Sequence, residues 1–298
     1  MKKERYKKQY AGWRYPVFIW MCVIILFLAA GCAPAGEVQP EQSVQIATAG
    51  NETIDKQGTT QQEIVYVPDD KKTQIPEAAP QNENPYGIDP LKPMVALTFD
   101  DGPSKYTWDI VHSLQTHRAR GTFFLMGSRV INHQAAIDYT LANHNEIASH
   151  GFSHKDMVKL TEDEMVEEIR LVDAAMEQQH QYTPRMFRVP YGNRDEAVLS
   201  VLAAEEKPVI GWSVDPYDWK VKDKETIVNH VLNSVQDGDI ILLHDIYEPT
   251  AQAVEELVPA LQERGYQIVT VSELFQFRGI TPEPGVYYKK LPPEEATE

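Results

Sequence analysis

Apolar and polar residues follow one another from Pro93 onward in short runs that predict strands and helices in alternation. Runs rich in branched and aromatic residues predict strands, and apolar residues that recur every three or four positions predict helices. The expected strands cover residues 94–99, 121–125, 146–149, 186–189, 208–214, 239–243 and 267–271. The expected helices cover residues 106–117, 134–142, 196–204, 226–235 and 251–262, with one more that begins after Thr161. This alternation indicates an α/β protein with a parallel sheet, which we expect to be a compact, irregular (β/α) barrel of about seven parallel strands.

The helix after Thr161 has a distinct start signal. Thr161 and Glu164 have the spacing of a capping box, in which the two side chains satisfy backbone N–H groups at the helix start. Apolar residues then follow at helical spacing, at Met165, Ile169, Val172 and Met176.

The first 32 residues follow a different pattern, which is typical of an export signal. Six Lys and Arg residues precede an unbroken apolar run over residues 17–30, and Gly31 and Cys32 follow it. The run is shorter than the ~20 residues that span a bilayer comfortably, and this order of basic, apolar and small residues marks a secretory signal. The ending from Ala29 to Cys32 resembles the lipobox of bacterial lipoproteins, which implies lipidation of Cys32, although Ala29 stands where Leu is usual. The alternative is an uncleaved membrane anchor that starts near Trp13.

Composition divides the rest of the chain into three parts. Residues 33–90 are rich in Gln, Glu, Pro, Thr and Asn, and their only alternating piece, at 64–67, is compatible with a short strand. They predict a flexible polar tether between the membrane and a folded domain at residues 91–278. The Pro- and Glu-rich residues 279–298 predict a loosely packed polar tail. Because a basic flank stays on the cytoplasmic side, we expect the domain on the outer face of the cell membrane.

Cysteine content and charge exclude several kinds of function. Cys22 and Cys32 are the two cysteines of the sequence and both lie in the leader, so the mature domain has neither disulfides nor cysteine catalysis. Residues 33–298 hold 22 Lys and Arg against 43 Asp and Glu, a formal charge of −21. Such a surface repels polyanions and argues against nucleic-acid binding. It suits a neutral polymer or a cationic product.

Polar residues capable of chemistry stand where the expected strands end. The carboxyl ends of the strands in a parallel barrel meet at one face, where active sites are built. The sequence therefore predicts that residues far apart in the chain form one site. These residues are Asp100, Asp101, His150, His154, Arg188, Asp215, Asp218 and His244.

Each of these groups also has a simpler interpretation. The segment from Asp100 to Pro103 is typical of a turn. A pair of histidines four apart arises by coincidence in a chain with nine of them. His244, after four apolar residues, fits a core histidine, and Trp212 and Trp219 fit core positions.

The functional interpretation is more specific. Two histidines and one carboxylate are a recurrent catalytic zinc set, which leaves room for water. Proline has no N–H group, so the amide of Tyr191 is the first donor after Pro190, and a fixed donor there is suited to an oxyanion. A carboxylate such as Asp218 beside His244 would keep the imidazole protonated, as a general acid requires.

Five segments in order resemble the motifs of the polysaccharide deacetylase family, which is carbohydrate esterase family four and contains the NodB-homology domain. The resemblance covers roughly residues 91–275, and the order of the five motifs makes it specific. The segments are Thr98–Gly102, Ser149–His154, Arg188–Tyr191, Asp215–Trp219 and Leu242–His244.

The resemblance implies a distorted (β/α) barrel in which water activated by a divalent metal, Zn²⁺ or Co²⁺, attacks an acetamide carbonyl. It assigns the metal to Asp101, His150 and His154. It makes Asp100 the base, held by Arg188, and His244 the acid, tuned by Asp218. The Tyr191 amide would stabilise the oxyanion, and the substrate pocket would include Pro190, Trp219 and Leu242. Spacing alone does not decide which of Asp100 and Asp101 does which job.

The expected function is hydrolysis of N-acetyl groups on N-acetylglucosamine residues of peptidoglycan or chitin-type polymers, with release of acetate. The chain would then be a hydrolase of linear amide C–N bonds, monomeric and attached to the membrane by its lipid or anchor. Two alternatives are an O-acetyl esterase acting on a polymer such as acetylated xylan, and a non-catalytic wall-binding lipoprotein of the same fold.

Overall fold

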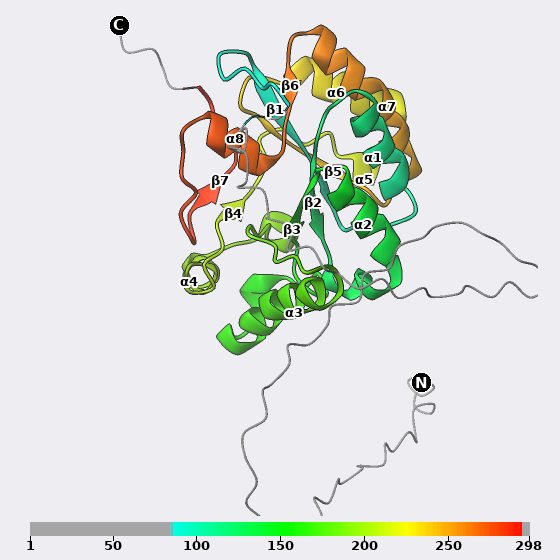
Figure 1. Ribbon diagram of the computed structural model, residues 1–298. Helices are drawn as coiled ribbons and strands as arrows, with labels where there is room; N and C mark the ends of the chain where they lie inside the picture. Colours follow the sequence, from blue (N-terminus) through cyan, green and yellow to red (C-terminus); the bar gives the residue numbers. More distant parts are fainter. Residues whose placement is uncertain (1–83, 85, 294–298) are drawn as a thin grey trace, which may run out of the picture. The chain divides into compact units, whose positions relative to one another are not determined.

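The protein is represented by a computed structural model that describes residues 84 and 86–293 (Figure 1). The predicted signal, Cys32, the alternating piece at residues 64–67 and nearly all of the predicted tether lie outside the described residues. Within the described part, no helix combines the length and the apolar character that crossing a bilayer requires.

Strands and helices alternate along most of the described chain. The strands are β1 (Met94–Asp100), β2 (Thr122–Leu125), β3 (Glu146–Ser149), β4 (Val209–Ile210), β5 (Ile240–His244), β6 (Gln267–Ile268) and β7 (Tyr287–Tyr288). The helices are α1 (Thr107–Thr116), α2 (Gln134–Ala142), α3 (Glu162–His180), α4 (Glu196–Ala204), α5 (Asp218–Val221), α6 (Lys224–Ser234), α7 (Glu248–Glu263) and α8 (Val271–Phe277). Four 3-10 turns complete them: η1 (Gly127–Arg129), η2 (Ile131–His133), η3 (Met157–Lys159) and η4 (Pro190–Gly192).

The strands form a distorted parallel barrel, as predicted. β1 pairs with β2 on one side and with β6 and then β5 on the other, and β2 continues to β3; all these pairs are parallel. Single parallel bridges then lead from Ser149 to Phe187, from Phe187 to Val209 and from Val214 to Ile241. The circle therefore closes back onto β5, but through bridges and not through full ladders.

Two predicted strands of this arc are corrected by the structure. The expected strand at 186–189 is reduced to the bridges of Phe187, and the one at 208–214 to the two residues of β4. The cause is a buried side chain: the Arg188 guanidinium donates to the carbonyls of Ile210 and Gly211. Those carbonyls bond to an arginine and not to a neighbouring strand.

The C-terminal stretch is also corrected. Residues 280–293 do not form a loose tail, because β7 pairs in parallel with β4 and Leu291 is only 2% exposed. The amide of Leu291 donates to the carbonyl of Gly238. The expected strand at 267–271 ends at Ile268, because Thr270 caps α8 through a capping box with Glu273.

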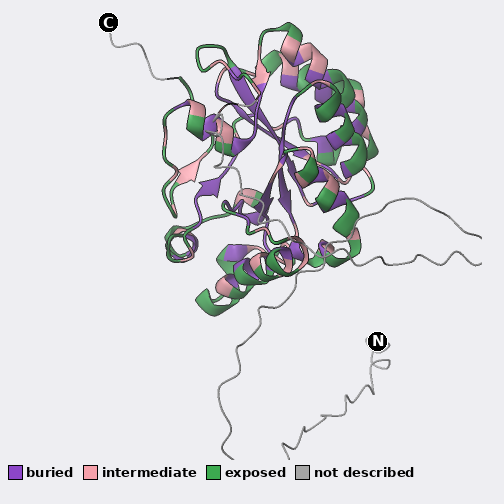
Figure 2. Cartoon of the chain, viewed as in Figure 1, coloured by how far each residue is buried: buried purple, intermediate pink, exposed green. Residues whose placement is uncertain are grey.

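The apolar core has two main layers, which explains why every residue of β1 is buried (Figure 2). One face of β1 packs inside the barrel, in a cluster that includes Met94, Ala96 and Phe124. The other face packs beneath α1, α6 and α7, in a cluster that includes Val95, Leu97 and Phe99. Because β1 is covered on both faces, its polar residues can reach solvent only at its carboxyl end.

Candidate active site

The carboxyl ends of β1 and β5 bring Asp100 and His244 side by side. The two residues are paired across the parallel ladder between these strands. Thr98 and Leu242 are paired two positions earlier and share the same face, because side chains alternate along a strand. The predicted proton-transfer residues therefore come from adjacent strands and point into the same mouth of the barrel.

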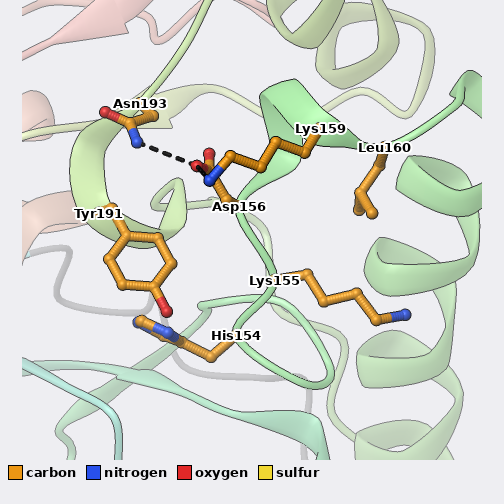
Figure 3. A pocket seen from close by; sticks show the side chains of 7 residues that line it. All are labelled: His154, Lys155, Asp156, Lys159, Leu160, Tyr191 and Asn193. Carbon is orange, nitrogen blue, oxygen red and sulfur yellow. Dashed lines mark hydrogen bonds and ion pairs between the residues drawn. The ribbon is translucent and has the colours of Figure 1, made fainter. Parts of the chain in front are cut away.

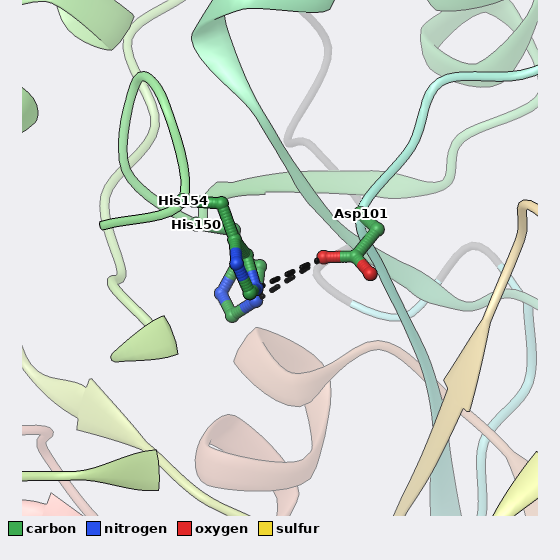
Figure 4. A group of neighbouring side chains, drawn as sticks. All are labelled: Asp101, His150 and His154. Carbon is green, nitrogen blue, oxygen red and sulfur yellow. Dashed lines mark ion pairs between the residues drawn. The ribbon is translucent and has the colours of Figure 1, made fainter. Parts of the chain in front are cut away.

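Asp101, His150 and His154 form a compact group at this mouth (Figure 4). Their ligating atoms all lie within 4.8 Å of one another. Asp101 Oδ1 lies 3.2 Å from His154 Nε2 and 3.6 Å from His150 Nε2. The same Oδ1 is a buried oxygen without a hydrogen-bond partner, so its lone pairs are available to a cation. The donor set fits Zn²⁺, which favours imidazole and carboxylate ligands and leaves a position for water.

His150 has the orientation that a neutral metal ligand requires. Its Nδ1 lies 2.8 Å from the carbonyl oxygen of Arg188, so Nδ1 carries the hydrogen and the Nε2 lone pair faces Asp101. Burial lowers the pKa of His150, although the charges of Asp100 and Asp101 oppose that shift. Fixing one ring nitrogen of a metal-binding histidine by a backbone carbonyl is a common way to set its orientation.

Asp100 is held apart from its neighbour by Arg188. Arg188 Nη1 lies 2.7 Å from Asp100 Oδ1, and both residues are almost fully buried. The other oxygen, Oδ2, is 3.6 Å from His150 Nε2 and faces the metal-ligand group. Arg188 also donates to Thr98 Oγ1 and lies over the ring of Phe124, so its position is fixed from several sides.

His244 is paired with a buried carboxylate. Its Nδ1 lies 2.8 Å from Asp218 Oδ1, and its backbone N–H donates to Asp218 Oδ2, which also accepts from Thr250 Oγ1. Burial alone would lower the pKa of His244, but the hydrogen bond and charge of Asp218, with the charges of Asp100 and Asp101, raise it to about 9. The imidazole is therefore protonated at neutral pH and presents Nε2–H.

Tyr191 lies beside His154, one member of the candidate metal-ligand group, as Figure 3 shows. The ring of Tyr191 lies 4.5 Å from the His154 ring, centre to centre, and the residue is 63% exposed. Tyr191 and His154 border an open depression of about 520 Å³. Pro190, which precedes Tyr191 in η4, is buried. The depression adjoins the site and is lined further by Lys155, Asp156, Lys159, Leu160 and Asn193.

Several site residues adopt left-handed backbone conformations. Asp101, His154 and Tyr191 have φ values of 72°, 59° and 62°. Residues other than glycine occupy this region at a cost, and such residues cluster at functional sites where the surrounding structure holds them. At the end of β1 this conformation lets Asp100 and Asp101, which are adjacent in sequence, serve the same site.

The structure therefore brings together most of the predicted site residues. Trp219 follows Asp218 directly in α5 and is 46% exposed, and Leu242 lies two residues before His244 in β5. Their role as walls of a substrate pocket stays a prediction. The residues that meet around the barrel mouth are Asp100, Asp101, His150, His154, Arg188, Tyr191, Asp218 and His244.

Two buried carboxylates near the site were missed from the sequence. Asp245 follows His244 and accepts from Thr107 Oγ1, and burial raises its pKa to about 7. Glu168 lies inside α3 and accepts from the backbone and hydroxyl of Ser153. The position of Asp245 next to a predicted site residue was an available signal. Glu168 gave a weaker one, as an acidic residue on the apolar stripe of its helix.

Comparison with known proteins shows that the chain is similar to polysaccharide deacetylases. The model of the polysaccharide deacetylase family matches residues 87–207. The peptidoglycan-N-acetylmuramic acid deacetylase PdaC of Bacillus subtilis is 37% identical over 209 residues, which are 68% of this chain and 44% of PdaC. The chitooligosaccharide deacetylase of a Bradyrhizobium species is 35% identical over 196 residues, which are 60% of this chain and 90% of that protein.

A solved structure of a family 4 carbohydrate esterase is also similar to this chain. A family 4 acetyl xylan esterase from Clostridium thermocellum in complex with a cobalt ion matches with a TM-score of 0.63 at 30% identity, over 67% of this chain and 99% of that one. This chain spans less than half the length of PdaC but nearly all of the two shorter relatives. With this identity and coverage, the chain belongs to the polysaccharide deacetylase family.

Proposed function

We propose that this chain is a divalent-metal-dependent hydrolase that removes N-acetyl groups from N-acetylglucosamine residues of peptidoglycan or chitin-type polymers. The observation that carries the proposal is the pairing of Asp100 with His244 across β1 and β5, beside the Asp101, His150 and His154 group. A base, an acid and a metal-ligand set then face one small volume, which is the arrangement that amide hydrolysis requires.

The metal set would hold the ion through Asp101, His150 and His154. When bound, a divalent ion lowers the pKa of water and polarises a carbonyl group. Asp100 is suited to take the proton from the attacking water, because Arg188 fixes Oδ1 and leaves Oδ2 facing the site. The hydroxyl adds to the acetyl carbon, and the Tyr191 N–H would donate to the carbonyl oxygen as negative charge develops.

His244 completes the reaction. The C–N bond breaks as the imidazolium of His244 gives a proton to the departing amine, and Asp218 stabilises the protonated ring beforehand. The products are acetate and a free amino sugar. The proton that Asp100 has taken is released to solvent, and His244 is protonated again for the next cycle.

Acetate release from defined substrates tests this proposal. N-acetylglucosamine oligomers and muropeptides are incubated with the Zn²⁺- or Co²⁺-loaded chain, and the products are identified by mass spectrometry. Loss of an acetyl group from the glucosamine units supports the proposal. Loss from muramic acid units alone would move the site to the sugar on which PdaC acts, as its name states. No release from any substrate overturns the proposal.

The esterase relative makes O-deacetylation the second candidate. The same residues serve an ester, but an alcohol leaves more easily than an amine and depends less on a proton from His244. Acetylated xylan assayed in parallel separates the two. A much higher kcat/KM on the ester, with no turnover of amides, would favour the esterase.

We also propose that the chain acts on the outer face of the cell membrane as a monomer, attached through a lipid on Cys32. The sequence pattern of residues 1–32 supports this proposal, and the alternative is an uncleaved membrane anchor that starts near Trp13. Cys32→Ser should release the protein from the membrane fraction if the lipid is the attachment. Retention of the variant in that fraction would indicate the anchor.

A further inference from the structure

Glu168 is a charged residue on the buried side of a helix. The buried residues of α3 are Met165, Glu168, Ile169, Val172 and Met176, so Glu168 stands in an otherwise apolar stripe. It is 3% exposed. A buried charge is costly unless it is paired and hydrogen-bonded, so its partners indicate what it does.

Glu168 has its polar contacts with the loop that carries His154, the second predicted histidine ligand. The backbone N–H of Ser153 donates to Oε2 over 2.7 Å, and its hydroxyl donates to Oε1 over 2.5 Å. The ammonium of Lys155 lies 3.2 Å from Oε1. Burial alone would raise the pKa of Glu168, but these partners lower it, so the carboxylate is charged. One carboxylate thus anchors the residues on both sides of His154.

The rest of this loop is held by backbone groups of η1. Gly127 N–H donates to the carbonyl of Gly151, and Ser128 N–H donates to that of Phe152. These bonds fix the first half of the loop, next to His150. The second half contains His154 in a left-handed conformation, with φ of 59°, which the chain adopts only under constraint. The contacts of Ser153 and Lys155 with Glu168 tie this half of the loop to α3.

We infer that Glu168 is a positioning residue that holds His154 in its metal-binding orientation through Ser153 and Lys155. Groups that orient metal ligands commonly affect metal affinity when they are replaced. The inference rests on the proposed metal site at Asp101, His150 and His154. The inference gives α3, which contains no predicted ligand, a role in orienting the predicted ligand His154.

Zinc affinity of the full chain tests the inference, measured by competition with a chromophoric chelator. Glu168→Gln keeps the shape of the side chain but removes its charge and turns one acceptor into a donor facing Ser153. We expect its Zn²⁺ affinity to fall by about tenfold or more. Glu167→Gln, on the exposed side of the same helix, is the matched control and should bind Zn²⁺ like the unchanged chain.

Ser153→Ala gives a second, milder change that keeps the loop backbone bond. Its affinity should fall less, and the loss in the double variant should be smaller than the product of the two single losses, because both act through one contact. A Glu168→Gln variant that melts earlier but binds Zn²⁺ as tightly as the unchanged chain overturns the inference alone. If Glu168→Gln does not fold, unchanged affinity in Ser153→Ala overturns it. An unchanged chain that binds no Zn²⁺ overturns the proposed metal site as well.

Discussion

Asp100 and Asp101 are adjacent in sequence but differ in their surroundings. Arg188 holds Asp100 below the protein surface, whereas Asp101 leaves the strand in a left-handed conformation and faces two histidines. Sequence spacing predicted that both carboxylates belong to the site but not how they divide the work. The difference arises from Arg188, which lies 87 positions after Asp101 in the chain, so no local pattern contains it.

The Asp100→Asn variant tests that division of work. The amide cannot accept a proton from water, so kcat should fall by about 10²–10⁴-fold. Zinc affinity should change little, because the proposed ligands are Asp101, His150 and His154 and not Asp100. The measurement is acetate release at saturating Zn²⁺ together with a chelator competition. A variant that loses zinc as well would show that Asp100 is also a ligand.

The alkaline limb of the pH profile should report His244. Its pKa is raised to about 9, so the acid is present below that pH and activity should decline as pH rises through it. In Asp218→Asn the carboxylate that stabilises the imidazolium is gone, while burial still lowers the pKa. The limb of kcat/KM should therefore move to lower pH. Asp223→Asn, at the exposed N-cap of α6, is the control. An unmoved limb in Asp218→Asn would exclude His244 as the acid.

At the scale of elements, local signals predicted the longer helices and the strands β1, β2, β3 and β5, but not α5 and α8. The α3 capping box at Thr161 and the ranges of α2 and α4 were predicted correctly, because caps and apolar periodicity act within a few residues. The strands at 186–189 and 208–214 were too long, because the Arg188 guanidinium takes carbonyls that a ladder would use. That competition depends on tertiary structure, which periodicity does not contain.

The prediction of a loosely packed C-terminal tail was the largest error at this scale. The variant Leu291→Ala tests the correction. Leu291 is 2% exposed, so its truncation should lower the free energy of unfolding by about 2–5 kcal/mol. Leu91 is 94% exposed, and Leu91→Ala is the matched control with an expected change within about 0.5 kcal/mol. Chemical denaturation measures both. Equal, small effects would mean that the stretch is loose after all.

For the whole molecule, two buried groups beside the barrel mouth make the metal-free protein sensitive to pH in the same direction. Asp245 has a pKa of about 7, raised chiefly by burial and further by Asp101, and His244 has one of about 9. Both folded-state pKa values lie above the ordinary values of an Asp and a His. Stability from each group is therefore fully present below the ordinary pKa and is lost as pH rises through the folded-state pKa.

Asp245→Asn isolates the first of these contributions. One pKa unit corresponds to ~1.4 kcal/mol. Loss of the Asp245 proton should therefore lower the free energy of unfolding of the metal-free protein by roughly 2–3 kcal/mol between pH 5 and pH 8. The asparagine carries no charge and keeps an oxygen that can accept from the Thr107 hydroxyl. The free energy of unfolding of the variant should therefore rise relative to that of the unchanged chain as pH increases over that range. Urea denaturation at several pH values measures the difference. A difference that stays constant from pH 5 to pH 8 would show that Asp245 does not change its charge there.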